Sequence, residues 1–436
     1  MNFLRNIVQN MNKLIAGFAF LTVAASAFAQ NGTNSPYSQY GYGDLTNQSV
    51  GFNKGMNGVG LAMRKGNEVN PLNPASYSAV DSLTMIFDGG LYGESANFKE
   101  NNKTANRKTG GFDYFSTLLR LFRNVGLSAG VMPYSNVGFD YAEKSKQKLG
   151  DETLTVERSY SGSGGFSQIY LGMGWRILKP LSVGFNAAYL FGDIRKEIEE
   201  GVSTEANYLF REYEVSVSSY KLDFGIQFEQ PIGKNDLLTI GATFSPGHSL
   251  KADPTCRMIM TSSLITRSDT TSFTITDGLK IPTSFGVGLA YTHASKLRVG
   301  ADFHLQKWGS LSFPAFSNSD YVLKEGLLKD RYQVNVGAEF MPNPMSRRLF
   351  GHIRYRIGAG YTTPYYNING QNGPKDLSVS LGLGIPIANS YNNRSILNIS
   401  GQWVRRTADN LLSENMFRIC IGLTFNERWF AKWKVE

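Results

Sequence analysis

The sequence predicts an exported all-β protein, namely a 14-stranded antiparallel transmembrane β-barrel with an N-terminal plug in its lumen. Three observations predict this fold class. The chain begins with an apolar segment that ends in a cleavage site, long segments alternate in hydrophobicity with period 2, and 46 Gly and 13% aromatic residues occur among 436. Such alternation gives each strand one apolar face and one polar or small face.

Residues 1–29 have the pattern of a secretory signal peptide. Arg5 and Lys13 form a basic region, Leu14–Ala24 is apolar, and Ala27–Ala29 fits an A-x-A cleavage site. No Cys directly follows this site, which excludes a lipoprotein. We therefore expect export and placement in the outer membrane of a Gram-negative cell.

Composition excludes several other classes. The aromatic content of 13% argues against disorder, and 46 Gly argue against a coiled coil. Beyond the signal peptide no run of 18 apolar residues suggests a membrane helix. The net charge of +9 is spread along the sequence without a block of consecutive Lys and Arg residues, so no nucleic-acid partner is expected. Cys256 and Cys420 are too few for a disulfide framework, and their redox state stays open.

The barrel is predicted over residues 81–436. In 296–306, for example, Leu297, Val299 and Phe303 alternate with Arg298 and Asp302. The predicted strands cover 82–98, 110–122, 125–142, 153–177, 181–197, 207–229, 237–250, 280–293, 296–308, 331–342, 350–363, 376–387, 395–406 and 414–427. A soluble sandwich would also alternate, but its strands average about five or six residues, whereas a tilted membrane-crossing strand needs about 9–11. Strand length, even number and export together favour the membrane barrel.

Connections of unequal length also fit a membrane barrel. Leu178–Pro180 and Pro231–Asn235 have the length of periplasmic turns. The longer extracellular loops are expected at Glu143–Asp151, Ile198–Asn207, Lys251–Lys280 and Ser310–Asp330.

The stretch 30–80 differs from the rest because it is rich in Gly and Asn and alternates little. It is too polar to face lipid, so it is either a periplasmic extension or a plug in the lumen. A barrel of fourteen strands has a lumen wider than its own side chains fill. We therefore predict that residues 30–80 form a plug or hatch segment.

Several stretches of the chain form a recognisable series, namely Gly55–Ala62 with Asn73-Pro74-Ala75, Ile281–Pro282 with Gly286–Tyr291, and Asn335–Phe340 with Arg354–Gly358. In their order and spacing they resemble the FadL-type outer-membrane transport family over essentially the whole mature chain. Asn34–Ser38 and Asn426–Phe430 are similar to Bacteroidota members. The resemblance implies a 14-stranded barrel with a lumenal N-terminal plug. It also implies passive transport of small hydrophobic compounds through a lateral opening or, alternatively, a structural subunit of an outer-membrane secretion or assembly complex.

The third predicted strand contains a proline near its middle. Proline donates no ladder hydrogen bond, so the strand must bulge or kink there, and Ser135 and Asn136 can satisfy the freed carbonyls. In the FadL-type family a kink in the third strand forms the lateral exit. The resemblance thus assigns this opening to Met132, Pro133, Tyr134, Ser135 and Asn136. The alternative is a harmless bulge that Met132 and Tyr134 seal.

Four charged residues lie on the polar faces of three successive predicted strands, namely Asp302, Glu339, Arg354 and Arg356. An Arg facing the middle of the bilayer costs roughly 2–4 kcal/mol, so we expect an inward ionic ladder that also orients the plug. Independent solvation in lumenal water is the alternative.

Asn73, Pro74 and Ala75 are expected inside the barrel near the first strand, because Pro74 fixes the chain and Asn73 can satisfy open backbone groups. The alternative is a tight turn that leads into the first strand.

No sequence motif supports a catalytic role. Gly126–Gly130 matches G-x-S-x-G, but Ser128 lies within a continuing strand rather than at a strand-to-helix turn. The four His are not spaced as a zinc site. We expect no enzyme activity, cofactor or metal. The expected partners are membrane lipids, a hydrophobic small-molecule ligand and possible partner outer-membrane proteins, and the sequence does not identify the substrate.

Overall fold

The computed structural model describes residues 32–100, 103–149, 152–202, 207–262, 267–317, 320–343, 348–387 and 395–428. The predicted signal peptide, residues 1–29, lies outside the described residues. In the described ranges no helix has the length and apolarity needed to cross a bilayer.

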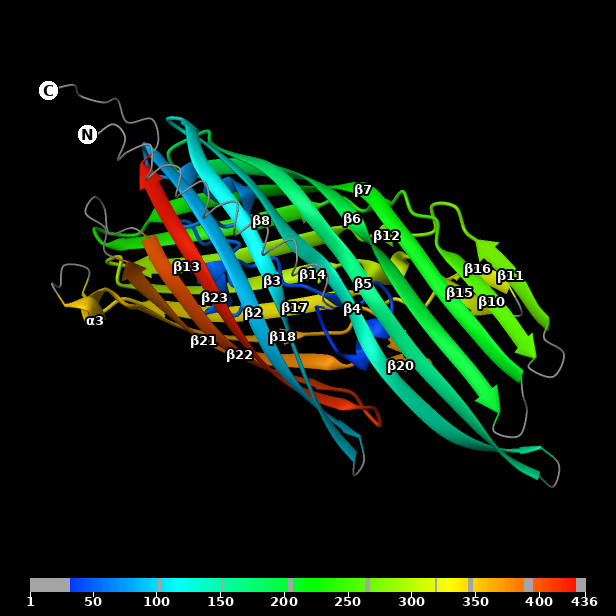
Figure 1. Ribbon diagram of the computed structural model, residues 1–436. Helices are drawn as coiled ribbons and strands as arrows, with labels where there is room; N and C mark the ends of the chain where they lie inside the picture. The colour runs from blue at the N-terminus through cyan, green and yellow to red at the C-terminus, as the bar shows by residue number, and fades with distance from the viewer. Residues whose placement is uncertain are drawn as a thin grey trace, which may run out of the picture.

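In these ranges, fourteen antiparallel strands form the wall of a β-barrel (Figure 1). Each strand pairs with its neighbour in the wall, and pairing of the first with the last closes the sheet. In chain order the wall strands are β2 (Thr84–Glu100), β3 (Lys103–Phe122), β4 (Val125–Leu149), β5 (Glu152–Arg176), β6 (Leu181–Val202), β7 (Asn207–Pro231), β8 (Asp236–Ser245), β13 (Ser284–His293), β14 (Leu297–Gln306), β17 (Arg331–Phe340), β18 (Arg354–Thr362), β21 (Lys375–Ile387), β22 (Ser395–Thr407) and β23 (Ser413–Arg428). The predicted antiparallel β-barrel and its fourteen strands are confirmed.

The two faces of the wall differ as the alternation predicts. On β14, Val299 and Phe303 are exposed on the outside, whereas Arg298 and Asp302 are buried on the inside. An apolar outer face suits lipid, and closure pairs backbone groups that hydrocarbon could not satisfy. The barrel is therefore a transmembrane one.

The long connections are more regular than predicted. The expected loop Glu143–Asp151 is wrong in large part, because β4 continues to Leu149 and β5 begins at Glu152. Likewise β6 runs to Val202, and β7 begins at Asn207. Polar strands of this kind can extend a hairpin into water, since there neither face has to be apolar.

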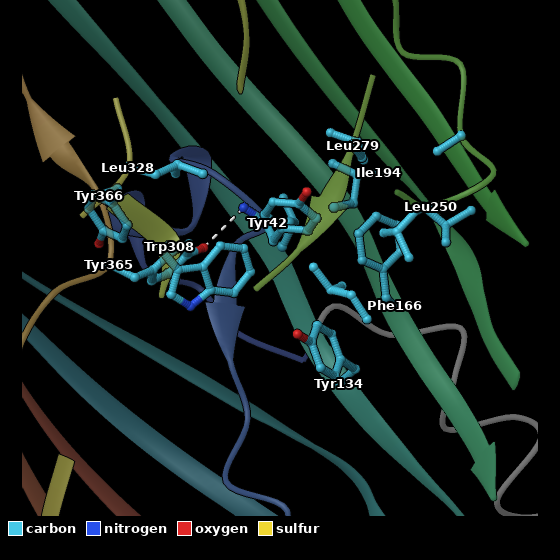
Figure 2. Close-up of a cluster of buried hydrophobic side chains, with 14 of the residues drawn as sticks. Tyr42, Tyr134, Phe166, Ile194, Leu250, Leu279, Trp308, Leu328, Tyr365 and Tyr366 are labelled. Carbon is cyan, nitrogen blue, oxygen red and sulfur yellow. Dashed lines mark hydrogen bonds between the residues drawn. The ribbon is translucent and has the colours of Figure 1, made fainter. Parts of the chain in front are cut away.

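The two longest connections fold into hairpins of their own. Between β8 and β13 the chain forms β9 (His248–Ser249), β10 (Thr255–Ser262), β11 (Arg267–Thr274) and β12 (Lys280–Ile281). Between β14 and β17 it forms η3 (Trp308–Ser310), β15 (Phe313–Ser317) and β16 (Asp320–Lys324). Beneath them lies a hydrophobic core that includes Tyr42, Phe166 and Trp308 (Figure 2).

The N-terminal segment, residues 32–83, precedes the wall and has short elements only. They are η1 (Pro36–Gln39), β1 (Asp44–Leu45), α2 (Gly51–Lys54) and η2 (Pro74–Ala79). The segment contacts inward-facing residues on opposite parts of the wall, so it lies within the barrel. A second hydrophobic core joins its Met56, Val59 and Tyr77 to wall residues such as Tyr114 and Tyr170.

Inward-facing glycines make room for this segment. A Cβ built on Gly241 of β8 would lie 2.0 Å from the carbonyl oxygen of Leu61. One built on Gly358 of β18 would lie 2.3 Å from the carbonyl carbon of Met56. The wall and the backbone of the segment therefore touch directly, which explains why one face of many strands carries glycine.

Candidate functional site

Strand β4 is irregular at its proline. The pairing of β4 with β5 shifts register between Pro133 and Ser135, so Tyr134 is the extra residue of a β-bulge. Pro133 has no N–H to give to a ladder, which is the physical reason for the bulge. The Tyr134 side chain is buried, and the Ser135 hydroxyl accepts a hydrogen bond from Phe166 N at 3.3 Å.

The ladder between β3 and β4 ends at this point. It runs from Phe122–Val125 to Phe115–Val131 and is not continued beyond Val131 in the described residues. The part of β3 above this point, from Lys103 to Tyr114, keeps its pairing with β2 on the other side. The two neighbouring strands thus part at the height of Met132, one residue before the proline.

The N-terminal segment takes the place of β3 beside β4. In β1, Asp44 pairs with Asn136 and Leu45 with Ser135. Thr46 N donates to Tyr134 O at 3.0 Å, and Gln48 Nε2 donates to Pro133 O at 2.9 Å. The freed carbonyls are therefore satisfied by Thr46 and Gln48, and the expectation that Ser135 and Asn136 would do this is wrong.

Ion pairs also hold β1 in place. Arg406 of β22 lies 2.9 Å from Asp44, 2.9 Å from Asp376 and 3.3 Å from Glu414. The Ser35 hydroxyl donates to Glu414 at 2.6 Å. Asp44 is thus tied both to the edge of β4 and to strands beyond β3, across the space between β3 and β4.

A cavity of about 350 Å³ lies under the long hairpins. Its lining is mainly aromatic and aliphatic and includes Tyr42, Phe139, Tyr160, Phe166, Ile194 and Tyr366. Figure 2 shows Tyr42 among Ile194, Leu279 and Trp308, with its N–H donating to the Tyr365 hydroxyl at 3.0 Å. At the cavity wall, Lys196 Nζ donates to Gln39 O at 2.6 Å and to Gly41 O at 3.0 Å, so one wall cation holds the N-terminal segment there.

A smaller cavity of about 150 Å³ borders the bend in β4. Met132 and Tyr134 line it together with Leu45 and Gln48 of the N-terminal segment. The rest of its lining is largely polar and includes Lys221, Asp223, His304 and Arg331. The two cavities and the end of the β3–β4 ladder therefore all meet residues 39–48.

Three of the four predicted charged residues gather in one ionic cluster. Glu339 binds Arg356 Nε at 2.7 Å, and it also binds Arg298 Nη2 at 2.7 Å. Glu68 of the N-terminal segment binds Arg298 at 3.1 Å and also contacts Arg354. The alternation places Arg298 on an inward face of its strand, but neither Arg298 nor Glu68 was predicted to join this cluster.

Asp302 does not join this cluster, so the four-residue ladder is corrected. Its carboxylate accepts hydrogen bonds from Gly60 N at 2.6 Å and Leu61 N at 2.9 Å. Asp302 is inward and buried as expected, but it binds the backbone of the N-terminal segment rather than an arginine.

Asn73, Pro74 and Ala75 lie inside the barrel at the start of η2, but not near the first wall strand. Asn73 Nδ2 donates to Leu61 O at 2.7 Å and to Ile226 O of β7 at 3.1 Å, and its Oδ1 accepts from Ala75 N at 3.1 Å. Pro74 lies against Gly184 of β6. The predicted neighbourhood is therefore wrong, whereas the role of Asn73 in satisfying backbone groups is observed.

The residues set aside as catalytic have structural partners. Ser128 is buried in β4, and its hydroxyl donates to Thr117 O at 2.7 Å. Cys256 and Cys420 are buried free thiols. In the part of the chain that the structure describes, no group of three His, Cys, Asp or Glu residues is arranged to hold a metal.

The barrel shares its fold with solved structures of FadL-type proteins. The barrel is similar to the Pseudomonas putida toluene transporter TodX, with a TM-score of 0.63 and 15% identity over 89% of this chain and 100% of that chain. It is also similar to the CymD monoaromatic hydrocarbon channel (TM-score 0.59, 13% identity, 90% and 99% covered). A Pseudomonas aeruginosa FadL homologue gives a TM-score of 0.60 at 11% identity, with 88% and 99% covered.

These identities establish a shared fold and no more. A comparison with curated proteins gave no match. A family model named BamG matches residues 11–436, which is nearly the whole sequence. The chain therefore belongs to the BamG family.

Proposed function

We propose that this protein is an outer-membrane channel for the passive transport of small hydrophobic compounds, which leave the lumen sideways between β3 and β4. The observation that carries the proposal is the end of the β3–β4 ladder at Phe115–Val131 beside the bulge at Pro133. The similar solved structures are a toluene transporter and a monoaromatic hydrocarbon channel, which supports a small aromatic cargo. No step in the proposal requires an enzyme, a cofactor or a metal.

The entry point is the aromatic cavity under the extracellular hairpins. Its volume of about 350 Å³ falls within the usual range of ligand pockets, and its lining is mainly apolar. From there a compound would pass residues 39–48 to reach Met132 and the space between the strands. In the closed arrangement seen here, Thr46 and Gln48 hold that space through hydrogen bonds to β4.

The direct test restores a regular strand. Pro133→Val combined with Asn136→Thr should allow β4 to pair further with β3 and should slow uptake of a radiolabelled aromatic hydrocarbon into proteoliposomes. Pro386→Val is the matched control, because Pro386 lies in β21, away from the gap. A heat-modifiability shift on gels shows whether each variant is folded. Unchanged uptake by a folded double variant would remove the lateral route.

The proposal also includes the cellular location of the protein. We place the protein in the outer membrane of a Gram-negative, Bacteroidota-type cell after cleavage of residues 1–29. The competing function, a structural subunit of a secretion or assembly complex, would leave uptake at the level of empty vesicles. It would also give a stoichiometric partner in purification from native membranes.

A further inference from the structure

The short turns at one end of the barrel repeat a pattern that transport does not explain. Three of them pair an exposed apolar side chain with an exposed basic one, whereas the turn between β13 and β14 carries only the exposed basic Lys296. The pairs are Phe122 with Arg123 between β3 and β4, Leu178 with Lys179 between β5 and β6, and Ile232 with Lys234 between β7 and β8. Phe122 is 67% exposed, and Leu178 and Ile232 are each 58% exposed.

The connection between β17 and β18 carries the same chemistry at the same end. Its helix α3 (Leu349–His352) follows Arg348, which is itself exposed. Phe350 on this helix is 74% exposed, and Leu349 beside it is 53% exposed. Phe350 is therefore more exposed than the phenylalanines of the lipid-facing wall.

Hydrogen bonds join these turns into a single rim. Arg176 N donates to Asn124 O at 2.9 Å, and Glu229 N donates to Pro180 O at 2.8 Å. Further round, Ala294 N donates to Asn235 O and Met341 N to Lys296 O, each at 2.8 Å. The apolar and basic side chains thus lie at a common height along the wall, on the side of the short turns.

A ring of this kind fits a lipid surface better than a protein. A protein partner would cover one patch, whereas these residues are spread over turns from β3 to β18. Each turn also directly continues strands whose outer face meets lipid. Apolar side chains beside Lys and Arg are the composition of segments that rest in the headgroup region, where the cations meet phosphates.

We propose that this ring seats the barrel in the leaflet on the short-turn side, which is the periplasmic one. Phe122, Leu178, Ile232 and Phe350 enter the boundary between headgroups and acyl chains. Arg123, Lys179 and Lys234 bind the phosphates of anionic phospholipids. The inference rests on the transmembrane barrel and is independent of the proposed transport.

Depth can be measured with a spin label on Phe350→Cys in vesicles of phosphatidylcholine and phosphatidylglycerol. The ratio of collision rates with oxygen and with a nickel chelate reports depth. Leu381→Cys on the outer face of β21 gives the lipid reference, and Thr104→Cys at the extracellular end of β3 gives the water reference. Unsubstituted protein gives the background of the two buried cysteines. We expect a ratio between the references, and a ratio equal to that of Thr104→Cys would overturn the proposal.

The charges have a separate test. The triple variant Arg123→Gln, Lys179→Gln and Lys234→Gln should retain less phosphatidylglycerol in mixed-lipid nanodiscs, as counted by native mass spectrometry. The expected loss is roughly fivefold in affinity per removed charge. Lys103→Gln, Lys108→Gln and Lys146→Gln form the matched control, since they remove three exposed charges at the other end. Equal retention by both variants would contradict phosphate binding by the ring.

Discussion

Leu45 of the N-terminal segment lies opposite Ser135 of β4, in the position that β3 would occupy if the wall continued regularly. Only Asp44 and Leu45 form this pairing, whereas β4 shares a long ladder with β5 on its other side. At a net contribution of about 0.5–1.5 kcal/mol per hydrogen bond, so short a pairing contributes less than the long ladders between the wall strands. The residues that fill the gap are therefore held by few ladder hydrogen bonds, together with the ion pair between Asp44 and Arg406.

Locking this contact should stop transport. Leu45→Cys with Ser135→Cys places two thiols on paired residues, whose Cα separation in antiparallel strands suits a disulfide. Under oxidation we expect uptake of an aromatic hydrocarbon to fall toward the level of empty proteoliposomes, and a reductant should restore it.

The control for this lock is a disulfide elsewhere. Met258→Cys with Thr271→Cys joins paired residues of the β10–β11 hairpin. It should form under the same conditions and leave uptake unchanged. Full uptake by the oxidised Leu45/Ser135 variant would mean that the compound does not pass β1.

Glu68→Gln should release the N-terminal segment from the wall. This change leaves Arg298 and Arg354 without one of their carboxylate partners, and both guanidinium groups are largely buried. Removing one partner of a buried ion pair costs about 3–5 kcal/mol. We expect higher single-channel conductance in planar bilayers and faster proteolysis of residues 32–83.

Glu157→Gln is the matched control for Glu68→Gln. Glu157 also pairs with a cation, Lys144 at 3.1 Å, but both side chains are exposed. Exposed pairs contribute about 0–1 kcal/mol, so conductance and proteolysis should stay as in the unsubstituted protein. If Glu68→Gln behaves like this control, the ionic cluster does not hold the segment.

The same carboxylate should make the segment sensitive to acid. Burial raises the pKa of Glu68, but Arg298, Lys65 and Arg354 outweigh burial and lower the pKa from 4.5 to about 2. A lowered folded pKa means that the ionised group stabilises the fold above about pH 4.5 and that this stability is lost as the pH falls to about 2. Single-channel conductance should therefore rise as the pH is lowered from about 4.5 to about 2. The Glu68→Gln variant should lack this part of the pH response.

Much of the wall could be predicted from the sequence because period-2 alternation is a local signal. Leu297, Val299 and Phe303 show this alternation within a few residues. Pro133 is likewise a local signal, because a proline inside a strand predicts an irregularity at that position. The continuation of β4 to Leu149 could not be predicted, because outside the bilayer a polar hairpin has the composition of a loop. Alternation in hydrophobicity is required only where one face of a strand contacts lipid, so it ends where the strand leaves the bilayer.

The contacts within the lumen were harder to predict. Arg298 was recognised as inward, but its partner Glu68 lies 230 residues away in a segment without periodicity. Asp302 was predicted to pair with arginines of the neighbouring strands, whereas it accepts hydrogen bonds from Gly60 N and Leu61 N of the same aperiodic segment. Thr46 and Gln48 gave no signal, because side chains that bond to a backbone carbonyl have no characteristic spacing.

The inward glycines provide the last prediction. Gly241→Val would place a branched side chain where a Cβ alone lies 2.0 Å from Leu61 O, and that contact is with backbone. Overpacking of this kind costs about 1–3 kcal/mol, and the N-terminal segment has to shift since the paired wall cannot. Conductance should rise and thermal stability should fall. Gly401→Val is the matched control, because Gly401 of β22 faces outward and its nearest contact is Phe417 at 3.7 Å. A valine at 401 should therefore leave both quantities unchanged, and equal behaviour of the two variants would mean that the segment is not held against β8.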